Sequence, residues 1–283
     1  MGALVDLHLH TTASDGRLSP AQLVRLAVAQ GLKQVSISDH DTTEGLAEAY
    51  LAAEELGGPR IIPGIELSTD IPGDEIHMLG YFIQYADEGF QEVLRRFRRG
   101  RVDRARLMVE KLEGLGIHLE WERVQQIAGE GSVGRPHIAL AMVEKGYCKE
   151  PRLAFPEYLG RNGLAYVERP KMTPAEAVQM LINVGGVPVL AHPGYLLDME
   201  TSIAELVDVG LIGMEVYYAN YSLDTVQHLA QVADRFGLIP CGGSDYHGLG
   251  NTGEPLPGAL GPPMSTVERL EAAALKLVHT SQP

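Results

Sequence analysis

Short apolar segments recur along the chain, and stretches with helical periodicity separate several of them. Such segments are typical of strands buried in a sheet, whereas amphipathic helices repeat every 3.6 residues. The predicted strands are Leu4–Leu9, Gln34–Ser38, Arg60–Glu66, Ile76–Phe82, Val187–Ala191, Gly213–Tyr217 and Leu238–Gly242. This alternation predicts an α/β fold with a mostly parallel sheet, and the strands are numerous enough to close or nearly close a barrel. An open doubly wound sheet is the alternative, but no G-x-G-x-x-G motif follows the first strand.

The predicted helices between these strands have recognisable ends. Ser19 suits the N-cap and Pro20 the first turn of the first helix, which Gly31 ends. Outside residues 87–170, the predicted helices are Pro20–Gln30, Thr43–Leu56, Thr173–Val184, Ser222–Phe236 and Ser265–Val278. Residues 247–263 are rich in Gly and Pro, which predicts a loop.

One charged and nearly strand-free segment, residues 87–170, interrupts the alternation. Its helical patterns cover Glu88–Leu115, Trp121–Ala128, Arg135–Lys145 and Pro151–Arg161. We interpret this segment as an inserted helical domain. The predicted division is therefore a barrel domain made of residues 1–86 and 171–283, and an inserted domain made of residues 87–170.

The overall charge narrows the kinds of partner. A net charge of −14 argues against broad binding to a nucleic-acid backbone, so we expect no long duplex nucleic acid as partner. No apolar run approaches the ~18 residues that a membrane span needs, so no membrane is expected either. The N-terminal residues lack the basic region of a signal peptide, and Cys148 and Cys241 give no disulfide framework, which together predict a cytoplasmic protein.

Histidines and carboxylates gather at the ends of the predicted strands. His8 and His10 close the first strand and, two residues apart, point to the same face. The candidate metal ligands are His8, His10, Asp15, His40, Glu66, His77, His192, Asp245 and His247. In α/β barrels the C-terminal strand ends meet on the face that holds the active site. This set exceeds the ligands of a single ion, so it predicts two or three divalent ions that share a carboxylate.

Taken singly, each residue has a simpler explanation. His77 alone would be interpreted as a partly buried structural histidine, and Asp15 before Gly16 as a turn residue. An H-x-H motif at the end of the first strand, combined with a D-x-H motif after the last, is a poor candidate for coincidence. Together the residues favour a metal centre.

The order of these residues resembles the PHP (polymerase and histidinol phosphatase) superfamily. The resemblance extends from His8 to His247 and implies a distorted seven-stranded (β/α)7 barrel with a small helical cap domain inserted. It implies that His8, His10, Glu66 and Asp245 hold one ion. It also implies that Asp15, His40 and His247 hold a second, and that His77 and His192 share Glu66 to hold a third. The ions would be manganese, iron or zinc.

A motif in the inserted segment resembles one particular group within this superfamily. Residues 132–139, S-V-G-R-P-H-I-A, resemble a motif of PHP phosphoesterases that act on nucleotides, namely nucleoside 3′,5′-bisphosphate phosphatases and 5′-to-3′ exoribonucleases on short RNA. The resemblance implies that Arg135 and His137 contact substrate phosphate, which suits a guanidinium fork. Arg101 and Arg104 are our candidates for further substrate contacts, although such a basic run is more often a solvated helix face.

The resemblance implies a metal-dependent phosphoesterase that hydrolyses phosphate from nucleotides or from 5′-phosphorylated short oligoribonucleotides, with water activated by two or three metal ions. The candidate catalytic residues are His192, His247 and Asp245, and the proton donor stays open between the two histidines. Asp39 is expected to orient a ligand histidine. The alternatives are a histidinol phosphate phosphatase and, in another class, a non-catalytic metal-holding interaction module.

Overall fold

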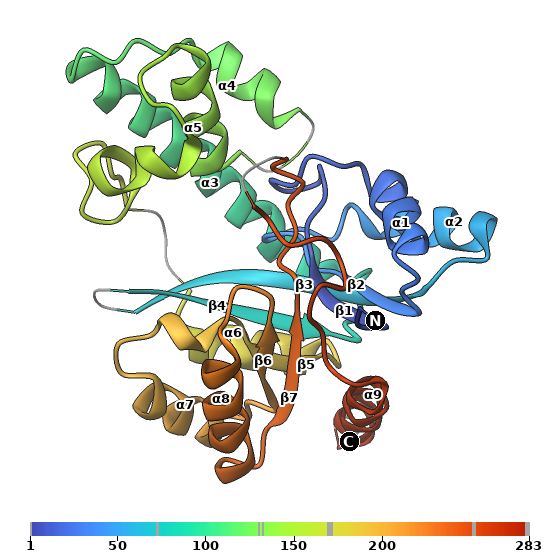
Figure 1. Cartoon of the computed structure of the whole chain (residues 1–283). Helices are drawn as coiled ribbons and strands as arrows, with labels where there is room; N and C mark the ends of the chain where they lie inside the picture. Colours follow the sequence, from blue (N-terminus) through green and yellow to red (C-terminus); the bar gives the residue numbers. More distant parts are fainter. Residues whose placement is uncertain are drawn as a thin grey trace.

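The computed structural model describes residues 2–71, 74–129, 131, 133–168, 172–250 and 253–280. Its strands follow one another round a single sheet in the order of the sequence, as Figure 1 shows. They are β1 Val5–Leu9, β2 Gln34–Ile37, β3 Arg60–Ile71, β4 Asp74–Tyr81, β5 Val187–Leu190, β6 Gly213–Tyr218 and β7 Ile239–Gly243.

The chain after β7 returns to β1 and nearly closes the barrel. The backbone nitrogen of Asp245 donates to the carbonyl of His8 at 2.9 Å, and that of His10 donates to the carbonyl of Tyr246 at 3.0 Å. A Cβ at Gly243 would lie 2.5 Å from Asp6 Oδ1, so glycine is needed for this close approach. The predicted seven-stranded α/β barrel is thereby confirmed, and the first and last strands become neighbours.

β4 runs against both of its neighbours, β3 and β5, whereas the remaining pairs are parallel. The prediction that β3 ends at Glu66 was wrong, because residues 67–71 continue the antiparallel ladder with β4. Glu66 therefore lies inside a strand. His77, on the reversed strand, pairs with Ser68 and lies inside β4 rather than at its C-terminal end.

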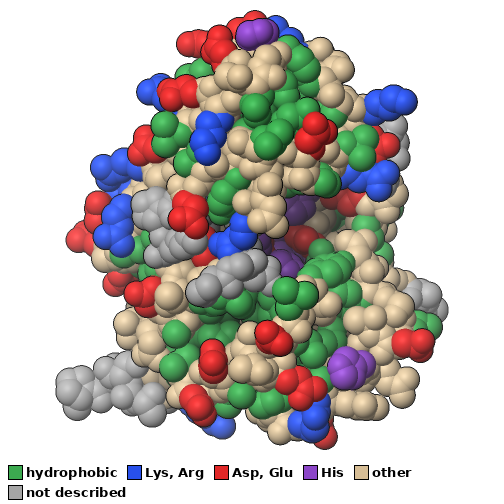
Figure 2. Space-filling view, turned by 90° about the vertical axis from the view of Figure 1, so that its left-hand side faces the viewer, with side chains coloured by type: hydrophobic (Ala, Val, Ile, Leu, Met, Phe, Trp, Pro, Cys, Tyr) green, Lys and Arg blue, Asp and Glu red, His purple; other side chains and the backbone are tan. Residues whose placement is uncertain are grey.

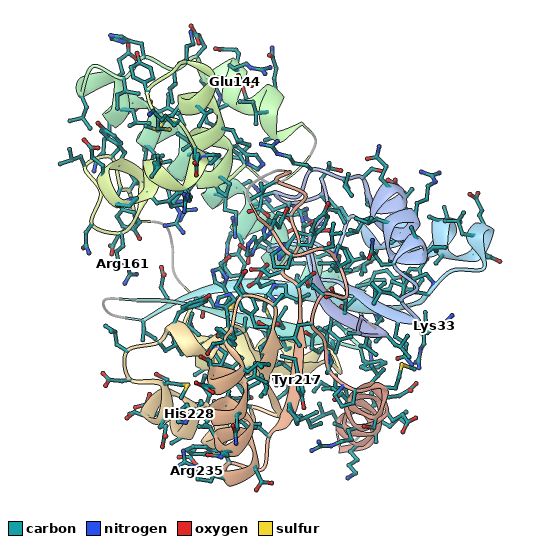
Figure 3. The ribbon with its side chains drawn as sticks, viewed as in Figure 1. Lys33, Glu144, Arg161, Tyr217, His228 and Arg235 are labelled. Carbon is teal, nitrogen blue, oxygen red and sulfur yellow. The ribbon has the colours of Figure 1, made fainter. Side chains whose placement is uncertain are left out.

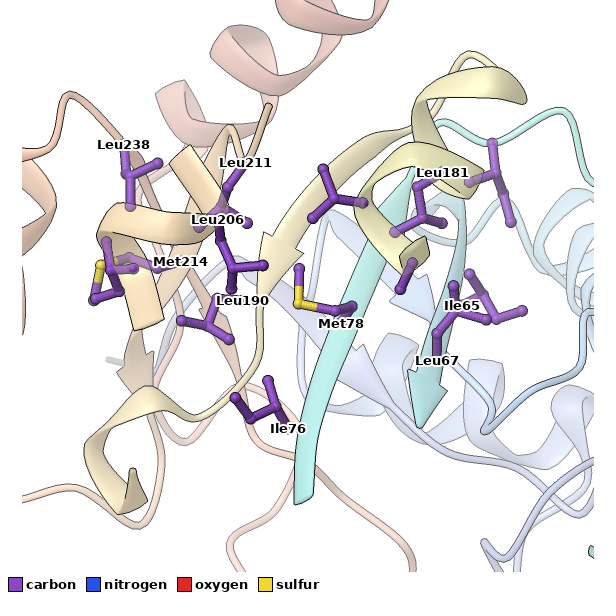
Figure 4. Packing of buried hydrophobic residues seen from close by; sticks show 14 of the residues in the cluster. Ile65, Leu67, Ile76, Met78, Leu181, Leu190, Leu206, Leu211, Met214 and Leu238 are labelled. Carbon is purple, nitrogen blue, oxygen red and sulfur yellow. The ribbon is translucent and has the colours of Figure 1, made fainter. Parts of the chain in front are cut away.

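Helices cover the barrel from outside. They are α1 Pro20–Ala29, α2 Leu46–Leu56, α6 Pro174–Asn183, α7 Met199–Asp208, α8 Leu223–Arg235 and α9 Met264–Thr280. α7 was not predicted from the sequence. In the structure, its N-cap residue Asp198 makes no side-chain capping hydrogen bond. Figure 4 shows part of the resulting core, in which Met78 and Leu190 of the sheet pack with Leu181 of α6.

Residues between β4 and α6 build the helical region at the top of Figure 1. It contains α3 Glu88–Gly114, α4 Trp121–Ala128 and α5 Arg135–Glu144. A 3-10 turn, Pro151–Leu153, and a π turn, Phe155–Leu159, replace the continuous helix predicted over 151–161, because Pro156 lacks the backbone N–H that such a helix needs. Fully buried Met108, Leu112 and Val124 belong to a hydrophobic cluster made of this region alone.

The first turns of α3 belong to the barrel instead. Phe90 and Leu94 pack in the cluster formed by the sheet and its helices. At the lower edge of the helical region, Arg161 donates to the carbonyl of Ile71 at 2.9 Å and lies 3.2 Å from Asp70 (Figure 3). The division at residue 87 stays a prediction, and the division at 170–171 lies outside the described residues. No helix in the described ranges has the length and apolarity to cross a membrane.

Candidate metal centre

The carboxylate of Glu66 is surrounded by imidazole rings from several strands. Its Oε2 atom lies 3.1–3.2 Å from a ring nitrogen of each of His8, His10 and His40. Its Oε1 atom lies 2.8 Å from His77 Nδ1 and 3.3 Å from His192 Nε2. Glu66 itself is 1% exposed. One buried carboxylate is thus shared by histidines that are far apart in the sequence.

Two aspartates complete the cluster. Asp245 Oδ1 lies 3.3 Å from His8 Nε2 and 3.0 Å from His10 Nε2. On the other side, Asp15 Oδ1 lies 3.4 Å from His247 Nε2, and Asp15 Oδ2 lies 3.9 Å from His40 Nε2. The structure therefore brings all the candidate ligands of the sequence together in one place.

Several ligand atoms of this cluster are buried without a hydrogen-bond partner. These atoms are His8 Nε2, both ring nitrogens of His10, His40 Nδ1, Asp15 Oδ1 and Glu66 Oε2. Buried polar groups that stay unpaired are costly and uncommon. Lone pairs of imidazole and carboxylate that converge on a common space suit divalent metal ions, which would satisfy them together. The residues present therefore fit the metals that the sequence predicts.

The ligand atoms form overlapping groups in which all atoms lie within 4.8 Å of one another. The groups are His8–His10–Glu66–Asp245, His10–Asp15–His40–His247 and His40–Glu66–His77. His10 and His40 each belong to two groups, whereas the resemblance assigned each of them to one ion. His192 lies beside Glu66 but outside these groups. Which ion each residue holds stays a prediction.

Backbone strain marks the same place. Asp41, His192 and Asp245 have positive φ angles of 54°, 31° and 56°, a region that residues other than glycine seldom occupy. Each of them follows a strand, so the rigid barrel holds the strained turn. Such strain persists where the surrounding structure fixes a side chain in a required position.

The histidines of the cluster differ widely in pKa. Burial lowers the pKa of His40 to about 3. Burial also opposes protonation of His247, but the nearby charge of Asp15 outweighs it and raises the pKa of His247 to about 10. Burial opposes ionisation of Asp15 and Glu66, yet the surrounding histidines hold the pKa of both carboxyls well below the usual range. The carboxylates are therefore charged and ready to bind cations at neutral pH.

Glu215, on β6, is a functional residue that the sequence analysis missed. It is fully buried, its Oε1 atom lies 2.9 Å from His8 Nδ1, and its Oε2 atom accepts the backbone N–H of His192 at 2.8 Å. Metal-ligating histidines commonly donate their second ring nitrogen to such a carboxylate. The only signal in the sequence is an acid inside the apolar run G-M-E-V-Y-Y.

The hydrogen bonds of Asp39 go to the loop after β1. Its carboxylate accepts hydrogen bonds from the Thr11 backbone N–H and hydroxyl, both at 2.7 Å, and from Ser14 Oγ at 2.6 Å. No hydrogen bond joins it to a histidine within the described part of the chain, although its charge interacts with that of His10, so an orienting role stays a prediction. Asp39 fixes the loop that leads to Asp15.

The arginines of the helical region face the cluster across a small cavity. Arg101, Arg104 and Arg135 line it together with Asp15, His40, His77, Ser68, Pro136 and Phe155, and its volume is about 80 Å³. Figure 2 shows histidine side chains at the bottom of the corresponding hollow, between the helical region and the barrel. Arg101 donates from Nε to Asp41 Oδ2 at 2.6 Å and also contacts Ser68 Oγ. The arginines expected to contact substrate therefore line this cavity, and their role in substrate binding stays a prediction.

His137 is not among the residues that line this small cavity. It lines a larger cavity of about 680 Å³ that also reaches Asp15, Arg17 and Leu140. Its Nδ1 atom accepts the backbone N–H of Gly134 at 2.9 Å, and burial lowers its pKa. Arg135 and His137 of the motif thus approach Asp15 from two cavities, while Ser132 of that motif lies outside the described residues.

A barrel that collects buried imidazoles and carboxylates around one shared carboxylate defines a class of metal-dependent hydrolases. Residues 6–147 match the PHP domain family. A 3′,5′-nucleoside bisphosphate phosphatase from Chromobacterium violaceum is 34% identical over 256 residues, covering 89% of this chain and 90% of that protein. The 5′-3′ exoribonuclease Rnm of Salmonella typhimurium is 35% identical over 249 residues, covering 86% and 85%.

Solved structures agree with this assignment. A crystal structure described as a metal-dependent phosphoesterase from Bifidobacterium adolescentis is 30% identical, with a TM-score of 0.87 over 95% of this chain and 96% of that one. The chain belongs to the PHP domain family. It is an enzyme, a metal-dependent phosphoesterase, and not the non-catalytic module considered as an alternative.

Proposed function

We propose that this phosphoesterase acts on nucleotides, with nucleoside 3′,5′-bisphosphates and 5′-phosphorylated short oligoribonucleotides as substrates. The observation that carries this proposal is the cavity in which Arg101, Arg104 and Arg135 face Asp15 and His40. Guanidinium groups grip phosphate in a bidentate manner, and the carboxylates opposite suit the metal ions that a phosphoesterase uses. The relatives named above, a nucleotide phosphatase and an exoribonuclease, support the same substrate class.

Two or three ions of manganese, iron or zinc, held by the histidines and carboxylates around Glu66, would supply an activated water and polarise the phosphoryl group. The chain itself supplies the remaining groups. Arg135, at the N-terminus of α5, holds a substrate phosphate and offsets charge on its oxygens as the ester bond breaks. Phe155 supports the guanidinium, whose carbon lies 5.9 Å from the ring centroid. The helical region, residues 87–170 in this proposal, caps the site and excludes water.

The leaving alkoxide needs a proton, and we assign this role to His192 rather than His247. His247 belongs to a group of potential ligands with Asp15, whereas His192 lies outside such groups among the described residues. Burial opposes protonation of His192, but hydrogen bonding to Glu66 outweighs it and raises the pKa. Its side chain is 22% exposed, so it can reach a substrate. Asp245, whose Oδ1 atom lies 3.3 Å from His8 and 3.0 Å from His10, would hold a metal ion together with them.

The test is a hydrolysis screen with manganese that measures released phosphate and, for the oligonucleotides, released mononucleotide. The substrates are nucleoside 3′,5′-bisphosphates, mononucleotides, 5′-phosphorylated trinucleotides and histidinol phosphate. We expect turnover of the first and third groups, and loss of turnover in the Asp15→Ala protein. Arg135→Ala should lower kcat/KM for nucleotides while metal content stays unchanged.

Preferential turnover of histidinol phosphate would refute the proposed substrate class. An Arg135→Ala protein with unchanged kcat/KM would refute the phosphate role of Arg135. Metal analysis of the purified protein identifies the native ions.

A further inference from the structure

Three tyrosines form an aromatic cluster beside His192. The ring centroids of Tyr195 and Tyr221 lie 5.5 Å apart, those of Tyr195 and Tyr218 lie 6.1 Å apart, and those of Tyr218 and Tyr221 lie 4.9 Å apart. These separations are typical of favourable aromatic packing. The cluster joins the turn that follows β5 to the end of β6 and the loop after it.

Two members of this tyrosine cluster are fixed by hydrogen bonds. Tyr218 donates its hydroxyl proton to Asp245 Oδ2 at 2.8 Å, which connects the cluster to a candidate metal ligand. The hydroxyl of Tyr221 accepts the backbone N–H of Gly194 at 2.7 Å, which holds the turn that carries Tyr195. The positions of the two inner rings are therefore set before any ligand binds.

Tyr195 is the outer member. Its side chain is 61% exposed, whereas Tyr218 is 6% exposed. The ring rests edge-to-face against Tyr221, and its centroid lies 6.4 Å from that of His192. An aromatic ring held rigidly by its neighbours, open to solvent and adjacent to the cluster around Glu66, is suited to accept a second planar ring.

A second feature is the cavity lined by Arg101, Arg104 and Arg135. His77 lines this cavity, its ring centroid lies 5.2 Å from that of His192, and the His192 centroid lies 6.4 Å from that of Tyr195. In a nucleotide the base is one ribose away from the phosphate. Figure 2 shows hydrophobic side chains along the edge of the hollow that holds the histidines.

From this arrangement we infer that Tyr195 is a stacking platform for the nucleobase of the substrate, with Tyr218 and Tyr221 as its support. The inference rests on the proposed nucleotide substrates. Stacking recognises the face of a base and not its edge, so the platform accepts all bases and binds purines more tightly than pyrimidines. The platform selects nucleotides over phosphate esters that lack an aromatic base.

The experiment compares Tyr195→Ala and Tyr195→Phe proteins with the unchanged enzyme. Each is assayed with an adenosine 3′,5′-bisphosphate substrate and with the abasic ribose bisphosphate. Binding of the product nucleotide is measured separately by calorimetry, which needs no turnover. Leu197→Ala is the matched control, because Leu197 is 91% exposed on the same loop but lies outside the tyrosine cluster.

We expect Tyr195→Ala to raise KM for the nucleotide about 5- to 100-fold more than for the abasic compound. Tyr195→Phe should restore binding, since the ring is retained, and Leu197→Ala should leave KM unchanged. Equal effects of Tyr195→Ala on both substrates, or a loss in Leu197→Ala as large as in Tyr195→Ala, would overturn the platform. An unchanged enzyme that hydrolyses no nucleotide at all would instead refute the proposed function.

Discussion

At the scale of single residues, the buried glutamates Glu66 and Glu215 contact the histidines of the cluster from different sides. Glu66 faces the ring nitrogens that point into the cluster. Glu215 contacts the opposite nitrogen of His8 and the backbone of His192 from behind. Because one ring nitrogen of His8 is occupied by Glu215, the other is directed at Glu66 and Asp245. The geometry of the ligand is thus fixed by a residue that lies behind it.

Glu215→Gln tests whether the contact between Glu215 and His8 strengthens metal binding. The substitution removes the negative charge behind His8 but keeps an amide oxygen that can accept the N–H of His192. We expect metal binding about 10- to 100-fold weaker, with the fold retained. Competition with a chromophoric chelator measures the affinity, and Glu205→Gln, which is exposed on α7, is the charge-matched control. Equal affinities in the two proteins would show that His8 needs no such partner.

Metal loading should release protons near neutral pH. Metal ligands must be deprotonated, and the pKa of His247 is raised to about 10 in the metal-free protein. His247 therefore holds a proton at neutral pH that an ion must displace, whereas His40, with a pKa of about 3, holds none. The release should be full well below pH 10 and should fade as the pH rises through that value. Calorimetric titrations in buffers of different ionisation enthalpy measure it, and heats that do not depend on the buffer would contradict the prediction.

At the scale of secondary structure, α3 connects the two regions. Its first turns pack on the barrel through Phe90 and Leu94, and its second half forms part of the core of the helical region. Between these parts, Arg101 pairs with Asp41, which follows β2 and is 1% exposed. The helix is thereby held at the point where the cavity lies.

Arg101→Ala should be costly for stability. It removes the guanidinium that pairs with the buried carboxylate of Asp41, and breaking such a buried ion pair typically costs about 3–5 kcal/mol. Urea unfolding measures the loss, and phosphatase assays should show a raised KM. Arg99→Ala on the same helix is the control, since the Arg99 side chain is 71% exposed and its removal should change the free energy of unfolding by less than ~0.5 kcal/mol. Similar losses in both proteins would contradict a specific contribution of the Arg101–Asp41 pair.

At the scale of the whole molecule, the metal cluster joins strands from both ends of the chain. His8 and His10 come from β1 and the segment after it, while Asp245 and His247 follow β7. Ions bound between them would tie the first and last strands of the barrel together, in addition to the backbone hydrogen bonds that nearly close it. Such binding to the folded state alone stabilises it by mass action.

Removal of metal should therefore lower the melting temperature. For an ion at a thousand times its Kd, the stabilisation is ~4 kcal/mol, which corresponds to a shift of the order of 10 °C for a chain of about this size. Differential scanning calorimetry with and without a chelator measures the shift. A Glu66→Gln protein should show a much smaller difference. A melting temperature that does not respond to the chelator would mean that the cluster binds no ion tightly.

The sequence by itself determined which residues meet at the site. Strand periodicity places His8 and His10 on one face, and the segments after β2, β5 and β7 carry His40, His192, Asp245 and His247. These patterns are local, so they can be recognised without knowledge of the strand pairing. The sequence also determined the position of most helices through their caps and breakers, as at Ser19 and Gly31.

Only the tertiary structure decided how these residues are shared. The pairing of β4 with β5 and the closure of the barrel depend on strands that are distant in the sequence, and no local pattern encodes them. Those pairings set which imidazoles face Glu66, bring Glu215 behind His8 and place Tyr195 beside His192. Distances between side chains from different strands follow from the register and closure of the whole sheet, which is the physical reason that composition and spacing could identify the ligands but not their arrangement.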